Sequence, residues 1–327
     1  MTGVHVLVIG CGPMGRLHAH ELRRAGATVS ATDALPQAAD RFAEEVGATA
    51  VRDAAAAVER GIDGAVVTTP TQTHPAVVAG LLEAGIPTFC EKPLALTLEE
   101  TRAVGERADA RGVPLQIGFH RRCDPEYRRI RAAVLDGSLG RVHIVRAATH
   151  TAGLPVDPAT CGSILRDLLI HDFDAVRYVC GVEPATVTTF PVDPTDSAGP
   201  AWNCPAVVSV LELRDGSTAV VTGGRPSPPG YDARLEVYGS AGSMAAGLDA
   251  RTPMRSREAP AEPSYARFTD RFADAYEAEM HAFAATVADG AEVPCTWRDS
   301  HAALRIAIAA ERSAQAGGVR VDVDGVG

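Results

Sequence analysis

Short apolar runs alternate with longer amphipathic segments over the first 120 residues of the chain. The apolar runs predict β-strands at residues 4–9, 27–32, 64–69, 86–90 and 113–119. The segments between them predict helices near residues 14–25, 36–46, 74–84 and 98–111. Thr97 and Glu100 form a capping box at the start of the last helix. This alternation is typical of a parallel sheet with helices on both faces, so residues 1–120 are predicted to form an α/β domain.

After residue 121 the pattern changes to strands that follow one another without long helices between them. They are predicted at residues 141–150, 185–192, 206–213, 217–223 and 233–239. Asp215-Gly216 marks a hairpin turn between two of them. Residues 121–327 are therefore predicted to form an α+β domain with a large, mainly antiparallel open sheet. An amphipathic helix at about 297–316 is expected to pack back on the first domain.

Composition and charge restrict the class of partner. The chain of 327 residues has a formal net charge of −10, which argues against a nucleic-acid backbone as partner. No window approaches the roughly 18 uninterrupted apolar residues of a membrane span, and the amino terminus enters the first strand without an export signal. The seven cysteines form no CxxC pair, which indicates reduced thiols. We therefore expect a cytoplasmic protein.

A glycine motif, GCGPMG, follows the first predicted strand. Gly10, Gly12 and Gly15 have the GxGxxG spacing, with Pro13 and Met14 between them. A tight turn without a ligand can have the same glycines. The preceding strand, the following helix and an acidic residue about 20 positions later favour a dinucleotide-binding Rossmann domain, in which the pyrophosphate lies at the helix N-terminus.

The acidic residue is Asp33, at the end of the second predicted strand. A carboxylate there accepts hydrogen bonds from the adenosine ribose and repels a 2′-phosphate, and ALPQ after it supplies no basic residue. The predicted cofactor is therefore NAD, not NADP. The strand at 64–69 leads into TTPTQTH, which places Thr68, Thr69 and Pro70 at the ligand-binding edge of the sheet. His74 either contacts the cofactor or caps the next helix, and we favour a structural role.

The segment CEKPL contains Lys92, the only lysine of the chain; every other basic residue is an arginine. One interpretation is a surface lysine beside a turn-forming proline. The other is an active-site ammonium, because a compact ammonium differs from a planar guanidinium where a single atom must be contacted.

A helix is predicted around residues 163–180. Asp167, His171 and Asp174 share one of its faces, and another face is apolar, formed by Leu165, Leu168, Leu169 and Val176. The polar face is either a core His–Asp pair or part of a site. A zinc site of His150, Cys161, Asp167 and His171 is a further possibility, but the spacing of a closed zinc site is absent and we expect no metal.

Several motifs in order along nearly the whole chain resemble the glucose–fructose oxidoreductase / inositol dehydrogenase / MocA family. After GCGPMG, TTPTQTH and CEKPL come GFHRRCDPEY (118–127), GSILRDLLIHDFD (162–174), YDARLEVYGSAG (231–242) and RFADAYEAEMHAF (271–283). Within the family, GFHRRCDP and LLIHDFD are most similar to inositol 2-dehydrogenases.

The resemblance implies a catalytic group of Lys92, Asp167 and His171. In it Lys92 would hold the reacting oxygen, His171 would be the base, and Asp167 would fix the imidazole. The resemblance also implies that Lys92-Pro93 lies at a cleft between the domains, that Glu91 and Lys92 contact the cofactor, and that a homodimer or homotetramer forms across the open sheet. Because an X–Pro bond is the one place where a cis bond costs little, we expect the Lys92-Pro93 bond to be cis.

The same resemblance implies that Arg122, His150 and Tyr231 bind the polyol. An ion pair of Arg122 with Asp124 or Glu126 is the other interpretation for that arginine. Ala152 stands where inositol dehydrogenases tend to have a polar residue, which leaves myo-inositol itself open.

The predicted function is hydride transfer between NAD and a secondary alcohol or ketone of a cyclitol or sugar, such as an inositol, an aminocyclitol or an aldose. An NADP(H)-dependent ketosugar reductase is disfavoured by Asp33. A non-catalytic NAD- or sugar-sensing regulator is disfavoured by the presence of Lys92, Asp167 and His171.

Overall fold

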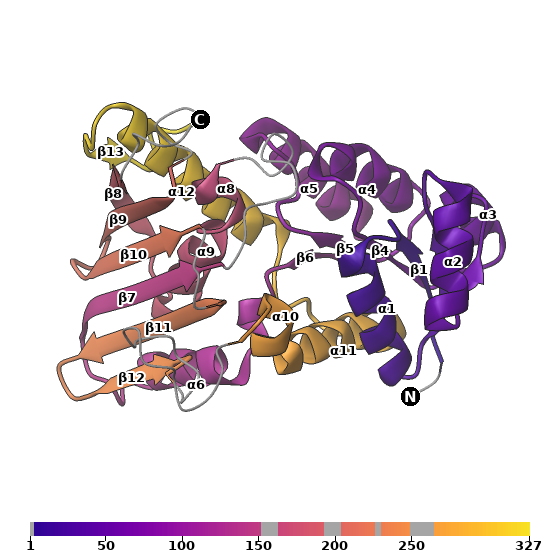
Figure 1. Ribbon diagram of the computed structural model, residues 1–327, viewed down its shortest axis with the longest axis horizontal. Coiled ribbons are helices and arrows are strands. Elements are labelled where there is room, and N and C mark those ends of the chain that lie inside the picture. The colour runs from indigo at the N-terminus through magenta and orange to yellow at the C-terminus, as the bar shows by residue number, and fades with distance from the viewer. Residues whose placement is uncertain (1–2, 152–162, 193–203, 226–229, 249–264) are drawn as a thin grey trace. The chain divides into compact units, whose positions relative to one another are not determined.

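The computed structural model describes residues 3–151, 163–192, 204–225, 230–248 and 265–327. By their contacts they form two compact units, each with its own sheet (Figure 1). The first unit combines Met1–Cys123 with Asp274–His301, and the second combines Asp124–Ala273 with Ala302–Gly327. Among the described residues, every helix is too short or too polar to span a lipid bilayer.

A six-stranded parallel sheet forms the centre of the first unit, in the order β3-β2-β1-β4-β5-β6. Its strands are β1 (His5–Ile9), β2 (Thr28–Thr32), β3 (Thr49–Ala50), β4 (Gly64–Val67), β5 (Thr88–Glu91) and β6 (Leu115–Gly118). The order reverses direction between β1 and β4, and ligands of such folds bind at this point, beyond the carboxyl ends of the strands. The predicted α/β Rossmann fold is confirmed, with β3 as an additional strand.

Helices cover both faces of this sheet (Figure 1). They are α1 (Pro13–Arg24), α2 (Pro36–Val46), α3 (Ala54–Glu59), α4 (His74–Glu83), α5 (Leu98–Arg111) and α11 (Ala273–Asp289), with short 3-10 turns η1 (Thr71–Thr73) and η2 (His120–Arg122). Leu22 of α1, Phe42 of α2 and Phe283 of α11 belong to one fully buried core on one face. The predicted cap of α5 is present, since Thr97 Oγ1 accepts from Glu100 N at 3.1 Å.

A buried carboxyl group interrupts this core. Glu279 of α11 is 1% exposed, and its Oε2 has no hydrogen-bond partner among the described residues. Burial, and to a smaller extent the charge of Glu91, raises the pKa of Glu279 well above its ordinary value. The folded protein therefore keeps a proton on Glu279 that the unfolded chain releases.

Glu279→Gln is expected to stabilise the protein increasingly as the pH rises from about 5 to about 8. In this range the unfolded chain binds fewer protons than the folded chain, so the free energy of unfolding of the wild type falls by up to about 1.4 kcal/mol per pH unit. A neutral amide removes this dependence. Thermal unfolding across the range measures it, with exposed Glu292→Gln as the control for lost charge. Parallel pH profiles of wild type and Glu279→Gln would contradict the assignment.

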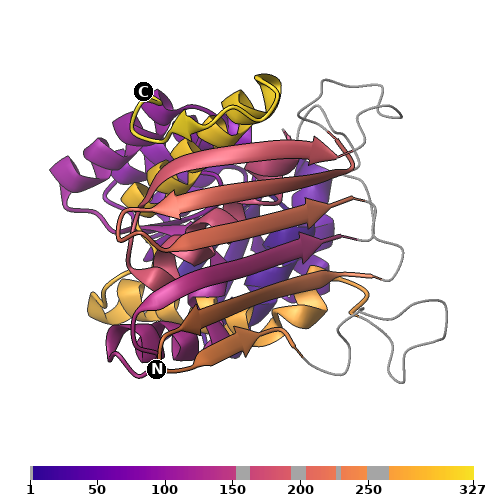
Figure 2. The same cartoon turned by 90° about the vertical axis from the view of Figure 1, so that its left-hand side faces the viewer.

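A seven-stranded sheet forms the second unit, in the order β12-β11-β7-β10-β9-β8-β13 (Figure 2). Its strands are β7 (Val142–His150), β8 (Pro184–Val192), β9 (Ala206–Leu213), β10 (Thr218–Gly224), β11 (Asp232–Gly239), β12 (Ser243–Ala246) and β13 (Val321–Asp322). All its neighbouring strands are antiparallel except β7 and β10. This confirms the mainly antiparallel sheet of the α+β prediction. Gly216, at φ 86°, forms the predicted turn between β9 and β10.

Helices of the second unit lie behind this sheet in the view of Figure 2. They are α6 (Pro125–Leu135), α8 (Ile164–Asp167), α9 (Ile170–Cys180), α10 (Phe268–Arg271) and most of α12 (Trp297–Gln315). The residues of helix α12 up to His301 belong to the first unit, and those from Ala302 onward belong to the second unit.

The prediction of a single helix around residues 163–180 is wrong in one respect. The chain forms two helices, α8 and α9, with a break at Leu168-Leu169. At the break Leu169 N bonds to Ile164 O, five residues back, and His171 N bonds to Leu168 O, three residues back. The regular α-helical spacing from Asp167 to His171 is therefore interrupted, although the leucines on the apolar side are buried as predicted.

Candidate active site

The loop between β1 and α1 has the backbone of a phosphate cradle. Gly10 has φ +101°, and a Cβ built there would lie 2.8 Å from Thr68 C. A Cβ at Gly15 would lie 2.1 Å from Gly10 O, whereas at Gly12 nothing lies within 4 Å. Gly10 and Gly15 thus allow the tight turn, and Gly12 leaves room for a ligand against the N-terminus of α1. This geometry fits the pyrophosphate of a dinucleotide.

Asp33 follows β2 directly and is bound to the glycine loop. Its Oδ2 accepts from Cys11 N at 2.8 Å, and its Oδ1 accepts from Leu35 N at 3.0 Å. A carboxylate has about four acceptor positions, so two backbone bonds leave capacity for a ribose diol. The residues present therefore fit NAD, which would contribute a hydride-accepting nicotinamide when bound.

Asp33→Ala is expected to raise the KM for NAD by about tenfold or more, since a hydrogen bond to a charged group contributes about 1.5–3 kcal/mol. The rate with NADP should rise, because the repulsion of a 2′-phosphate is lost. Steady-state rates with each cofactor measure both changes. Asp40→Ala, an exposed acidic position on α2, is the matched control. An unchanged ratio of NAD to NADP use would contradict the role of Asp33.

The loop after β4 and the start of α4 form hydrogen bonds with the loop after β1 and with the loop after β5. Thr68 Oγ1 donates to Gly10 O at 2.8 Å. His74, the first residue of α4, is 1% exposed, with Nε2 2.7 Å from Thr69 O and Nδ1 2.9 Å from Pro93 O. These are backbone carbonyls, so the side chain does not cap the helix and that expectation was wrong; a contact of His74 with the cofactor stays a prediction. Burial is the main cause that lowers the pKa of His74, and Lys92 adds to it.

Lys92 follows β5, and the Lys92-Pro93 peptide bond is cis, as we expected for this X–Pro bond. Its half-buried neighbour Glu91 has Oε1 2.7 Å from His18 Nε2, and its Oε2 accepts from Lys92 N at 3.1 Å. Burial acts to raise the pKa of Glu91, but the bond from His18 and the charges of His18 and Lys92 lower it overall. The carboxyl beside the lysine is therefore ionised.

The second unit contains Asp167 and His171. Asp167 is the last residue of α8, and its Oδ2 accepts from Arg225 Nη2 at 2.6 Å. Arg225 follows β10 and is 6% exposed. The carboxylate therefore accepts a charge-assisted hydrogen bond from a buried guanidinium. Sequence analysis missed this arginine. Asp174, which was predicted to share a face with Asp167 and His171, is 1% exposed. It forms an ion pair with Arg177, with Oδ1 3.4 Å from Arg177 Nη1.

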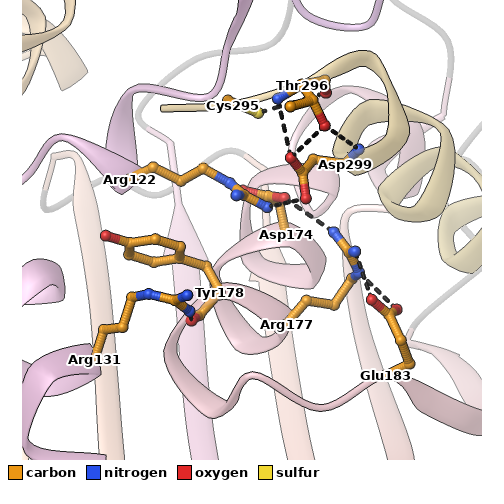
Figure 3. Close-up of polar contacts among 9 residues, drawn as sticks. All are labelled: Arg122, Arg131, Asp174, Arg177, Tyr178, Glu183, Cys295, Thr296 and Asp299. Carbon is orange, nitrogen blue, oxygen red and sulfur yellow. Dashed lines mark hydrogen bonds and ion pairs between the residues drawn. The ribbon is translucent and has the colours of Figure 1, made fainter. Parts of the chain in front are cut away.

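Arg122 forms an ion pair that differs from the one expected (Figure 3). Its Nη2 lies 2.9 Å from Asp299 Oδ1, whereas Asp124 and Glu126 pair with Arg271 at 3.3 and 2.9 Å. Asp124 also caps α6, where it accepts from the N–H groups of Glu126 and Tyr127. Whether Arg122 also binds substrate stays a prediction.

Two other predicted substrate residues lie near each other in the second unit. His150 at the end of β7 faces Asp232 across the sheet, with Nδ1 3.6 Å from Oδ2. Tyr231 is 6% exposed and packs edge-on against Phe272, with ring centroids 6.3 Å apart. The roles of His150 and Tyr231 in binding stay predictions.

The zinc interpretation involves Cys161, which lies outside the described residues, as does Ala152. Within the described ranges, no cluster of three His, Cys, Asp or Glu side chains could hold a metal ion.

Comparison with known proteins identifies the fold family. Residues 4–119 match the family model described as "Oxidoreductase family, NAD-binding Rossmann fold", and residues 127–245 match the "GFO/IDH/MocA C-terminal domain". The chain belongs to the GFO/IDH/MocA oxidoreductase family. This confirms the resemblance, and the NAD-binding domain of the family confirms NAD as the cofactor.

Relatives within the GFO/IDH/MocA family span almost the whole chain. The myo-inositol dehydrogenase Hyg17 of Streptomyces leeuwenhoekii is 41% identical, with 97% of this chain and 99% of the relative covered. An inositol 2-dehydrogenase of Rhizobium meliloti (strain 1021) is 34% identical, with 94% and 95% covered.

Solved structures agree with this fold. A myo-inositol dehydrogenase from Corynebacterium glutamicum ATCC 13032 has a TM-score of 0.85 at 30% identity, covering 98% of each chain. GenD2 from gentamicin A biosynthesis, in complex with NAD, has a TM-score of 0.84 at 27% identity, covering 98% of this chain and 97% of GenD2.

Proposed function

We propose that the protein is an NAD-dependent dehydrogenase that transfers a hydride between the nicotinamide and a secondary alcohol of a cyclitol or sugar. The observation that carries the proposal is the position of Lys92. The only lysine of the chain directly follows β5, at the sheet edge where the glycine loop, Asp33 and Thr68 also lie. An ammonium at this edge is suited to the oxygen of a substrate that reacts with NAD.

In the proposed mechanism, Lys92 donates to the reacting oxygen, on which negative charge develops as the hydroxyl proton leaves and which becomes the carbonyl oxygen as the hydride leaves the carbinol carbon. His171 accepts the hydroxyl proton, because an imidazole gains and loses protons near neutral pH. Asp167, which is paired with Arg225, orients the imidazole and stabilises its protonated form. In the reverse direction the same groups protonate the alkoxide.

The substrate class is supported by the chain's relatives. Hyg17 is named a myo-inositol dehydrogenase, and the Rhizobium meliloti relative an inositol 2-dehydrogenase. GenD2 belongs to gentamicin A biosynthesis. We therefore propose a polyhydroxylated ring, such as an inositol, an aminocyclitol or an aldose, with Arg122, His150 and Tyr231 contacting its hydroxyl groups.

We further propose a cytoplasmic homodimer or homotetramer. The six described cysteines are free thiols, as is usual in a reducing compartment. Apolar side chains of the second sheet are exposed, including Ile144 and its cross-strand neighbour Tyr238, at 45% and 37%. A second copy that covers this sheet would bury them.

A substrate screen tests the proposed function. Inositol isomers, aminocyclitols and aldoses are each incubated with NAD, and the absorbance of NADH is followed. At least one polyol should reduce NAD, with a lower rate when NADP replaces it. NAD binding without turnover of any of the three classes would contradict the proposal and favour a sensor.

A further inference from the structure

A histidine of helix α1 is buried against the glutamate that precedes Lys92. His18 is 0% exposed, and its Nε2 lies 2.7 Å from Glu91 Oε1, although the two residues are 73 positions apart. Because a carboxylate is an acceptor, Nε2 carries the proton of this bond. The other oxygen, Oε2, accepts the backbone N–H of Lys92 at 3.1 Å. Glu91 thus connects His18 to the backbone of the lysine.

The surroundings of Glu91 favour this orientation of the carboxylate. The ring of His18 packs edge-on against Phe89 and Tyr276, with centroids 5.0 and 6.0 Å apart. A Cβ at Gly118 would lie 3.2 Å from Glu91 Oε2, so the glycine leaves the room that the carboxylate needs. Aromatic rings lie against the His18 ring on two sides, and its Nε2 is the polar partner of Glu91 Oε1.

We propose that His18 is a positioning residue for Lys92 and acts through Glu91. Its bond to Oε1 fixes the carboxylate so that Oε2 receives the backbone N–H of Lys92. This also directs the negative charge toward His18. A carboxylate released from His18 would be free to attract the neighbouring ammonium and draw it from the reacting oxygen. The inference rests on the proposed role of Lys92.

The effect should appear in kcat and not in cofactor affinity. His18 lies in the middle of α1 and its Nε2 contacts Glu91, whereas the proposed phosphate cradle is at the N-terminus of this helix, at Gly12. A displacement of about 1 Å of a catalytic group can cost about 100-fold in rate. We expect loss of the His18 bond to lower kcat by about tenfold to 100-fold, with the Kd for NAD changed less than about threefold.

Two amides distinguish a positioning role from a packing role. The side-chain nitrogen of glutamine can reach the place of Nε2, whereas that of asparagine reaches only the place of Nδ1. His18→Asn should lose kcat with myo-inositol, or with the best polyol of the screen, and His18→Gln should restore most of it. Thermal unfolding is measured for both, and exposed His20→Asn on the same helix is the matched control.

The proposal also predicts non-additivity. Glu91→Gln should lower kcat, and adding His18→Asn to it should lower kcat little further, because both changes break one connection. Wild-type kcat in His18→Asn, an equal loss in His18→Gln, or multiplied losses in the double variant would overturn the proposal. If His18→Asn does not fold, a wild-type kcat in Glu91→Gln would overturn it as well.

Lys92→Ala separates this inference from the proposed function. An active Lys92→Ala enzyme would remove the basis of both. An inactive Lys92→Ala enzyme together with a fully active His18→Asn enzyme would leave the role of Lys92 in place and overturn only the role of His18.

Discussion

Lys92→Ala is expected to lower kcat/KM for the polyol by about 100- to 1000-fold, the usual loss when one donor to a developing oxyanion is removed. The Kd for NAD should change much less than kcat/KM, because the glycine loop and Asp33 still bind the cofactor and only the contact expected from Lys92 is lost. Steady-state kinetics and a binding titration with NAD measure the two quantities.

Lys92→Arg should not restore the activity. A guanidinium keeps the charge, but its planar fork and longer reach do not present a single rotatable ammonium to one oxygen. Arg102→Ala on the exposed side of α5 is the matched control for lost positive charge. The composition offers an independent check, since amine-directed acetylation can modify only Lys92 and the terminal amine. Full activity in Lys92→Arg would show that charge alone suffices.

His171→Ala is expected to lower kcat by about 100- to 10,000-fold, the range for loss of a general acid–base group. Binding of NAD should be affected little, because the glycine loop and Asp33 are unchanged. Steady-state rates and a titration with NAD measure the two effects. His143→Ala, an exposed histidine on β7, is the control. A variant that keeps the kcat of the wild type would assign the base to another residue.

The sequence predicted the strands of both sheets because their apolar runs are long enough to show a period. It missed β3 (Thr49–Ala50), β12 (Ser243–Ala246) and β13 (Val321–Asp322), because strands of two to four residues are too short to show a period. It could not predict that Asp274–His301 belongs by contact to the first unit. An amphipathic pattern shows that a helix has a buried face, but not which sheet that face contacts. The break at Leu168-Leu169 was hidden because both leucines continue the apolar pattern.

Local chemistry was predictable, and long-range polar partners were not. The glycine loop, Asp33 and Lys92 could be predicted because their residue types fit the backbone on either side. Arg225, which pairs with Asp167, and Asp299, which pairs with Arg122, are far from their partners in sequence. Closeness in sequence suggested Asp124 as the ion-pair partner of Arg122, although Asp124 already accepts hydrogen bonds from backbone N–H groups of α6.

His74 has two acceptors and, when neutral, a single proton to donate. Its lowered pKa favours the neutral imidazole, yet both of its nitrogens face carbonyl oxygens, those of Thr69 and Pro93. A neutral ring therefore satisfies one carbonyl at a time, and the choice of tautomer decides which. The loop after β4 and the loop after Lys92 thus compete for one hydrogen, so a change that fixes the tautomer in favour of one loop loosens the other.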